Sequence, residues 1–159
     1  MTLTFVTTKE RRDLLRTTGT WRWEEFFKGG DVTHEEMLTR EVEGANVSGL
    51  MPTVLVMLED EVPVAMWAIC LDDLEGRPEL NPWLAGVYVD TPHRGKGYGA
   101  RMIAELEALA SREGIARLSL YTPNSASFYA KYGWTMVETF EKSGKAYSIM
   151  QKHLQAPTT

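Results

Sequence analysis

Arg94-Gly95-Lys96-Gly97-Tyr98-Gly99-Ala100 lies between an apolar strand pattern and a strongly amphipathic helix pattern. Its three glycines stand at alternate positions, so the backbone can approach an anion closely, and the N–H groups and dipole of the following helix favour negative charge there. Arg94 and Lys96 strengthen the same field. The stretch is predicted to bind phosphate groups. A glycine-rich turn with solvated basic side chains would show the same pattern, so the neighbouring sequence must decide.

Two other phosphate-binding loops fail on their neighbours. A Walker A loop needs Ser or Thr after its Gly-Lys pair, and here Gly97 follows Gly95-Lys96. A dinucleotide-binding fold needs an acidic residue at the end of the next strand, but that strand, residues 117–121, runs into Thr122-Pro123-Asn124. The chain after residue 90 is also too short for a doubly wound sheet. The Walker A reading is therefore rejected, and the dinucleotide reading is disfavoured.

Bulk composition favours one domain over residues 1–154, with 155–159 as a frayed tail. The chain has 159 residues, of which 43% are apolar and 25% charged, enough for a single sizeable core. A net charge of −5 argues against nucleic-acid and membrane-surface binding. Cys70 is the only cysteine and the three histidines are scattered, so neither a disulfide nor a metal site is expected. No signal or membrane segment is evident at the N-terminus, which favours a cytoplasmic protein.

Hydrophobic periodicity and turn residues predict a mixed α/β (α+β) fold. A strand-helix-strand unit around the glycine loop implies one parallel pair, and flanking hairpins imply antiparallel neighbours. Thr33 and Glu36 form a capping box for a helix, and residues 44–49 are expected to be a loop. The predicted strands are residues 3–6, 53–58, 62–71, the stretch before the glycine loop, 117–121, 134–140 and 145–152; helices are predicted at 9–17, after Thr33, after the glycine loop and around 125–132.

Two blocks of sequence resemble the GCN5-related N-acetyltransferase (GNAT) superfamily. The first is the strand and glycine loop from Trp83 to Ala100. The second, at the spacing that this superfamily uses, comprises Leu118-Ser119-Leu120-Tyr121, Asn124, Ala126, Phe128-Tyr129, Lys131 and Tyr132-Gly133-Trp134. Together they cover about a third of the chain. The resemblance implies a single domain with a mostly antiparallel sheet, a central parallel pair splayed at the cofactor site, and helices on both faces.

The resemblance also implies the chemistry, which is transfer of an acetyl group from acetyl-coenzyme A to an amine by direct attack, without a metal. The pantetheine arm would pair with the backbone of Val87, Tyr88 and Val89. Asn124 would hydrogen-bond that arm, and Tyr129 would protonate the leaving thiolate. From the residues alone, Asn124 could also be a helix cap and Tyr129 a core aromatic. The pyrophosphate would be held by Arg94, Gly95, Lys96, Gly97, Tyr98, Gly99 and Ala100.

The acceptor site is the least specified part of the sequence. Trp21, Trp23, Glu24 and Glu25 match the acceptor wall of the family only loosely, and they would suit a cationic amine. A general base is left open among Glu24, Glu25, Asp72, Asp73 and Glu79, or is not needed. A small-molecule amine is the first choice of acceptor and a protein amine the second. A sensor that binds acyl-coenzyme A without transfer, and a homodimer, both stay open.

Overall fold

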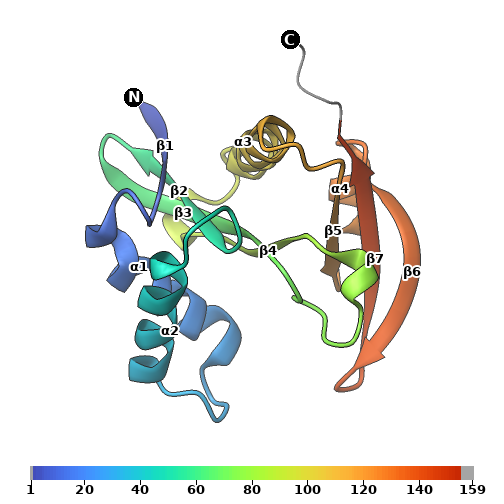
Figure 1. Ribbon diagram of the computed structural model, residues 1–159, viewed down its shortest axis with the longest axis horizontal. Coiled ribbons are helices and arrows are strands. Elements are labelled where there is room, and N and C mark those ends of the chain that lie inside the picture. Colours follow the sequence, from blue (N-terminus) through green and yellow to red (C-terminus); the bar gives the residue numbers. More distant parts are fainter. Residues whose placement is uncertain (1, 155–159) are drawn as a thin grey trace.

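The computed structural model describes residues 2–154. In it, the strands pair as the hairpins predicted from the sequence require. The sheet has the order β1-β2-β3-β4-β5-β7-β6 (Figure 1). Every neighbouring pair is antiparallel except β4 and β5, which are parallel. The strands are β1 (Leu3–Thr7), β2 (Thr53–Glu59), β3 (Val62–Cys70), β4 (Trp83–Val89), β5 (Arg117–Thr122), β6 (Thr135–Lys142) and β7 (Lys145–His153). The predicted mixed sheet with a single parallel pair is confirmed.

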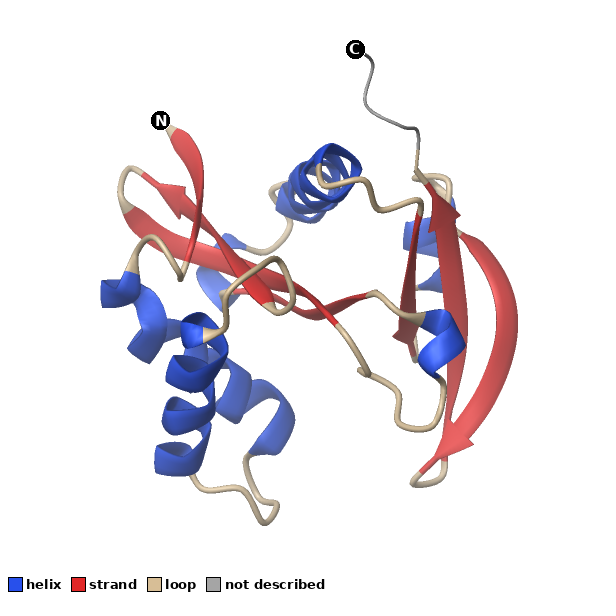
Figure 2. Ribbon diagram, viewed as in Figure 1, coloured by secondary structure: helices blue, strands red, loops and turns tan. Residues whose placement is uncertain are grey.

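Helices cover both faces of this sheet, as predicted: α3 lies on one face, and α1 and α2 lie on the other (Figures 1 and 2). The α-helices are α1 (Leu15–Arg22), α2 (His34–Asn46), α3 (Tyr98–Arg112) and α4 (Ala126–Ala130). Shorter helical turns are η1 (Arg12–Leu14), the π-helical η2 (Trp23–Phe27), η3 (Pro78–Leu80) and η4 (Thr91–His93).

The core has two layers because β2 is buried on both of its faces. Leu55 and Met57 belong to the large cluster under α3, whereas Val56 and Leu58 pack with Leu14 on the opposite face. Successive side chains of a strand point to opposite faces, so an unbroken apolar run indicates a strand covered on both sides. The α3 side chains in the large cluster are Tyr98, Met102, Ile103, Leu106 and Ala110. This packing fixes α3, and with it the glycine loop that precedes α3.

Two predicted boundaries in the N-terminal third are wrong. Helical structure predicted for residues 9–17 begins at Arg12 and continues to Phe27, so residues 21–26, which lay outside the predicted helices, are helical. Close packing on α2 explains the extension, since a Cβ on Gly19 would lie 2.8 Å from the Leu38 side chain. Helix α2 itself runs to Asn46, into the loop predicted at 44–49. Tertiary contacts outweigh the weak local signals here.

The capping box prediction is correct at its first member. The Thr33 hydroxyl accepts a hydrogen bond of 3.1 Å from the Glu36 amide.

Within residues 2–154, no helix has the length and apolar character needed to cross a bilayer. In the same range, no three His, Cys, Asp or Glu side chains gather as metal ligands would. The predicted tail, 155–159, lies outside the described residues.

Candidate active site

The site begins where β4 and β5 separate. Their parallel register contains one pair, Trp83 with Ser119, and the Ser119 amide donates to the Pro82 carbonyl at 3.0 Å. Beyond that point β4 continues to Val89 while the two strands diverge (Figure 1). The backbone edge of Val87–Val89 that would face β5 is therefore uncovered by sheet pairing. This is the splayed parallel pair that the family resemblance implies.

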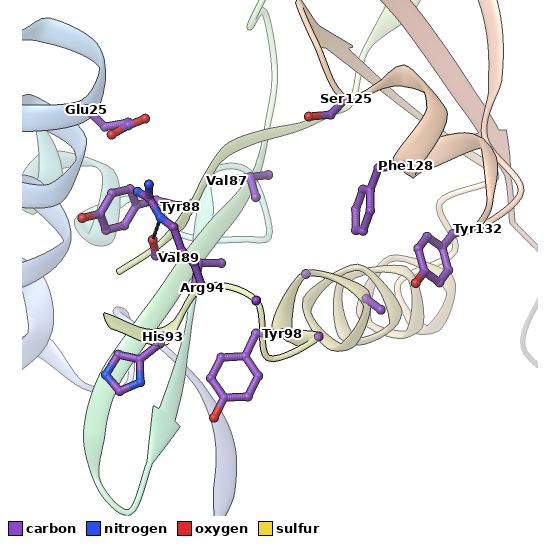
Figure 3. Close-up of a pocket in the computed structure, with 14 residues that line it drawn as sticks. Glu25, Val87, Tyr88, Val89, His93, Arg94, Tyr98, Ser125, Phe128 and Tyr132 are labelled. Atoms are coloured by element: carbon purple, nitrogen blue, oxygen red, sulfur yellow. Dashed lines mark hydrogen bonds between the residues drawn. The ribbon is translucent and has the colours of Figure 1, made fainter. Parts of the chain in front are cut away.

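A cavity of about 620 Å³ occupies this splay, which is within the size range of small-molecule sites. Figure 3 shows β4 on one side of the cavity and Phe128 and Tyr132 on the other. The predicted site residues that line the cavity are Glu25, Val87, Tyr88, Val89, Arg94, Gly95, Gly97, Tyr98, Gly99 and Ala100, and the others lining it are His93, Ser125, Phe128 and Tyr132. Six predicted site residues are not among them: Trp21, Trp23, Glu24, Lys96, Asn124 and Tyr129.

The glycine loop keeps its backbone accessible at this cavity. Gly97 has φ +78° and ψ 15° at the N-cap of α3, the left-handed conformation that glycine adopts most easily. A Cβ built on Gly95 or Gly97 would have no heavy atom within 4 Å. Glycine has no side chain to cap the helix, so the opening turn of α3 offers N–H groups and a positive dipole end to an anion. The geometry fits the predicted phosphate-binding role.

Arg94 lies beside this loop and is held against β4. Its Nε donates to the Val89 carbonyl at 2.8 Å, as Figure 3 shows, and its guanidinium lies 5.5 Å from the centre of the Tyr88 ring. The Tyr88 hydroxyl in turn donates to Asp90 at 3.1 Å. The guanidinium therefore has a fixed position at the edge of the cavity. A fixed positive charge loses little conformational freedom when it meets an anion.

Glu59, at the end of β2, ties the loop to the sheet, a contact that the sequence analysis missed. The Tyr98 hydroxyl donates to its carboxylate at 2.7 Å, which raises the pKa of the tyrosine. His93 Nδ1 lies 3.3 Å and Lys96 Nζ 3.9 Å from the same carboxylate. Lys96 thus points toward Glu59 in this structure, which explains why its side chain does not line the cavity. The 39 residues between Glu59 and Tyr98 left no local signal for this pairing.

A bulge in β4 carries a second feature that the sequence did not reveal. Met66 is opposite Tyr88 and Ala68 is opposite Ala85, so β4 has one extra residue here, and Gly86 adopts φ +62°. The Arg22 guanidinium occupies the space where a Cβ of residue 86 would lie. Any side chain at position 86 would displace it.

The same arginine is locked from behind by Glu41 of α2. Arg22 Nε donates to Glu41 at 2.8 Å, and the exposed fractions of the two side chains are 16% and 6%. Arg22 Nη2 also lies 3.9 Å from the Met66 sulfur. The N-terminal helices therefore place a buried, paired cation directly against the bulged strand, next to the cavity residue Val87.

The wall across from β4 is built by α4. Phe128 packs over the loop, since a Cβ on Gly99 would lie 3.1 Å from its ring. Tyr129 is 8% exposed, with its ring 5.3 Å from Phe128 and 6.1 Å from Trp134, and burial raises the pKa of its hydroxyl. Asn124 is exposed and does not cap α4. Ser125 holds the N-cap position without a side-chain capping bond, and its amide donates to the Thr122 hydroxyl at 3.1 Å.

The predicted acceptor wall divides into two parts. Trp21 packs on Tyr88 at 5.2 Å between ring centres, which places it against the back of the cavity strand. Trp23 turns away, donating from Nε1 to the Val32 carbonyl at 2.8 Å and packing on His34. Glu24 and Glu25 are both exposed, and only Glu25 lines the cavity. The helical periodicity of residues 21–27 separates neighbours that a loop could have brought together.

The sequence matches the model of a known protein family. Residues 15–134 match the model of the acetyltransferase (GNAT) family, which includes both predicted blocks, the N-terminal helices and the bulged strand. The chain belongs to the GNAT acetyltransferase family. This family of acetyltransferases is the one that the resemblance of the two blocks implied.

Individual relatives share the fold or a short segment. A curated relative, N-alpha-acetyltransferase 80 of Mus musculus, is 42% identical over 52 residues, which are 33% of this chain and 17% of that protein. An aminoglycoside 6′-N-acetyltransferase solved with coenzyme A superposes with a TM-score of 0.75 at 12% identity, over 100% of both chains. The Salmonella typhimurium protein yncA, solved with acetyl-CoA, gives a TM-score of 0.71 at 18% identity, over 100% of this chain and 98% of the other.

Proposed function

We propose that this GNAT protein transfers an acetyl group from acetyl-coenzyme A to a small-molecule amine by direct attack of the amine on the thioester. One observation carries the proposal: a single cavity joins the uncovered backbone edge of β4 to the glycine loop that opens α3. The first suits an extended amide-containing arm, and the second suits a pyrophosphate. Coenzyme A contains both groups in series. The coenzyme- and acetyl-CoA-bound relatives with this fold support the same ligand.

The glycine loop would hold the pyrophosphate through backbone N–H groups at Gly95, Gly97 and Gly99. Arg94 would add a fixed positive charge, and Lys96 would add another by leaving Glu59 for the phosphate. Hydrogen bonds to charged groups contribute about 1.5–3 kcal/mol each, so a few of them suffice for micromolar affinity. Because the net charge of the chain is −5, this local positive region is needed to attract an anionic co-substrate.

The uncovered edge at Val87, Tyr88 and Val89 would pair with the pantetheine amides. Asn124, exposed at the start of the opposite wall, is the proposed partner from the other side. The bulge before Val87 frees a backbone N–H from the sheet ladder, and that N–H would stabilise the negative charge that develops on the thioester oxygen. The Arg22 guanidinium lies beside this bulge, in the space that a Cβ on Gly86 would take.

Tyr129 is the proposed proton donor to the departing thiolate. Burial raises the pKa of its hydroxyl above the ordinary value of 10, so it is protonated at neutral pH and able to donate. Tyr132 lines the cavity and is a second hydroxyl on the same wall. On the acceptor side, Glu25 lines the cavity and Trp21 packs on the lining residue Tyr88, so these two remain the proposed contacts. Trp23 and Glu24 do not line the cavity and would act only if the amine extended beyond it.

Coenzyme A release with a panel of amines tests the proposal. The panel contains small primary amines, a peptide with a free N-terminus and a peptide with an internal lysine, and acetyl-coenzyme A binding is measured by calorimetry in parallel. We expect binding, and amine-dependent release that is fastest with a small amine. Faster turnover of a peptide would favour a protein amine as the acceptor. Binding with no release by any amine would identify a sensor.

A further inference from the structure

Glu59 is the last residue of β2, and its carboxylate lies against the segment that forms the glycine loop. The Tyr98 hydroxyl donates to this carboxylate at 2.7 Å, His93 Nδ1 lies 3.3 Å from it, and Lys96 Nζ lies 3.9 Å from it. Lys96 Nζ is also 3.4 Å from His93 Nδ1 and 5.9 Å from the centre of the Tyr98 ring. Figure 3 shows the His93 and Tyr98 rings extending from the loop to the same side. One carboxylate therefore gathers three side chains from residues 93–98.

The two cations of the glycine loop are held differently. Arg94 is fixed by a carbonyl, since its Nε donates to Val89 at 2.8 Å, and it lines the cavity. Lys96 instead has the Glu59 carboxylate as its charged neighbour, and it does not line the cavity. The exposed fractions of these two side chains are 43% for the lysine and 17% for the glutamate. One loop cation thus faces the cavity, and the other is directed to a counter-ion.

Lys96 can change its partner at little cost. It lies between Gly95 and Gly97, where a built Cβ would meet no heavy atom within 4 Å, and its four-carbon stem is flexible. Its 3.9 Å separation from Glu59 is longer than a hydrogen bond, so the contact is electrostatic only. A partly exposed ion pair of this kind shifts an equilibrium by no more than about fivefold. A pyrophosphate bound at the loop backbone can therefore take the lysine from Glu59.

Glu59 stays in place when Lys96 leaves. Its hydrogen bond from Tyr98 does not involve the lysine, and Tyr98 is 5% exposed in the first turn of α3. An anion bound at the loop would therefore meet a fixed negative charge attached to the same segment. Repulsion between such charges weakens binding, and added salt screens it.

We propose that Glu59 is an internal counter-ion of the phosphate site, which competes with the pyrophosphate of coenzyme A for Lys96 and so limits the affinity for the coenzyme. This rests on the proposed binding of acetyl-coenzyme A at the glycine loop. Lys96 moves from Glu59 to the phosphate on binding and returns when the product leaves. Glu59 thereby makes coenzyme A easier to release than the loop alone would.

Glu59→Gln tests the competition, because it removes the charge and keeps a side-chain oxygen that can accept from Tyr98. Calorimetry should show acetyl-coenzyme A bound about fivefold more tightly than by the wild type in about 50 mM salt. The difference should shrink below about twofold in about 0.5 M salt, where charges are strongly screened. Glu61→Gln is the matched control: it removes the same charge from the β2–β3 turn, where Glu61 lies 3.5 Å from Arg11. Its affinity should stay within about twofold of the wild type.

A donor without phosphates shows where Glu59 acts. S-acetylpantetheine has the thioester arm but no pyrophosphate, so its KM should be the same in Glu59→Gln and the wild type, whereas that for acetyl-coenzyme A should fall. A double-mutant cycle adds the partner. Lys96→Gln should cost more acetyl-coenzyme A affinity in the Glu59→Gln background than in the wild type, because only the wild-type lysine must first leave a carboxylate.

Four results would overturn the role of Glu59: unchanged or weaker acetyl-coenzyme A binding in Glu59→Gln, an equal gain in Glu61→Gln, a gain that persists at high salt, or an equal effect on S-acetylpantetheine. Wild-type protein that binds acetyl-coenzyme A but acetylates no amine would overturn the acetyl-transfer proposal and leave the role of Glu59 intact. Wild-type protein that does not bind acetyl-coenzyme A would overturn both.

Discussion

Gly97→Ala tests whether the glycine loop binds the co-substrate through its backbone. Gly97 has φ +78° and open space around a built Cβ, so in the free protein the added methyl meets no neighbour and costs only backbone strain. An L-residue in the left-handed region loses about 1–2 kcal/mol, partly offset by the lower entropy of the unfolded chain. The net loss in the free energy of unfolding should be about 1 kcal/mol, or a fall in Tm of about 2–4 °C.

Gly114→Ala supplies the matched control. Gly114 has φ +80° and equally open space, but it follows the other end of α3, about 22 Å away for a helix of 15 residues. The stability cost should therefore be the same in both variants. Only the methyl at Gly97 projects where an anion would approach the backbone, and loss of one charge-assisted hydrogen bond should weaken binding by about 2 kcal/mol, or about 30-fold.

Calorimetric titration with acetyl-coenzyme A, together with urea unfolding, measures both quantities. We expect similar unfolding free energies for the two variants and weaker binding for Gly97→Ala alone. Wild-type affinity in Gly97→Ala would refute backbone recognition at this loop. Equal weakening in both variants would show that loss of stability, rather than loss of a contact, reduces binding.

Three further predictions concern buried groups. Tyr129→Phe should lower kcat by about 10²–10⁴-fold while acetyl-coenzyme A affinity is retained, and a wild-type kcat under chemistry-limited conditions would assign Tyr129 to packing alone. Glu41→Gln leaves the Arg22 charge without its partner and should lower the free energy of unfolding by about 2–3 kcal/mol, which urea unfolding measures. This loss is smaller than for a fully buried ion pair because the Arg22 side chain is 16% exposed. Burial raises the pKa of Asp73, so its charge destabilises the native state above that pKa. Asp73→Asn should therefore raise Tm at pH 7 and lose this advantage below the ordinary carboxyl pKa of 3.8. An equal Tm of the two proteins at pH 7 would contradict the inferred burial.

Local features of the fold were predictable because their causes are local. The Gly97 N-cap, the apolar face of α3 and the left-handed Gly114 after it follow from helix periodicity and glycine chemistry within a few turns. The N-terminal helices were misplaced because their limits depend on packing: Gly19 lets α1 approach Leu38 of α2, and nothing near residue 19 in the sequence reports that contact. Local propensity is a weak guide when a neighbouring element supplies most of the stabilisation.

The candidate site shows the same division. The glycine loop, the strand before it and the α4 aromatics were found from sequence because each occupies one continuous segment. The sequence did not show that Lys96 would face Glu59, that Asn124 would not cap α4, or that Trp23 would turn toward Val32. Those outcomes depend on where each side chain points after the helices and strands have packed together.

For this protein, the sequence alone determined the mixed sheet, the anion-binding turn and the family to which the chain belongs, since hydrophobic period, turn chemistry and motif spacing are properties of short segments. Only the tertiary structure decided which charges meet. Arg22 reaches Glu41 and Gly86, and Tyr121 of β5 meets Phe140 of β6 and Tyr147 of β7, through packing between elements that are far apart in the chain. The energy of such pairs depends on distances of a few ångströms between distant residues, and those distances are set when the whole sheet and its helices assemble.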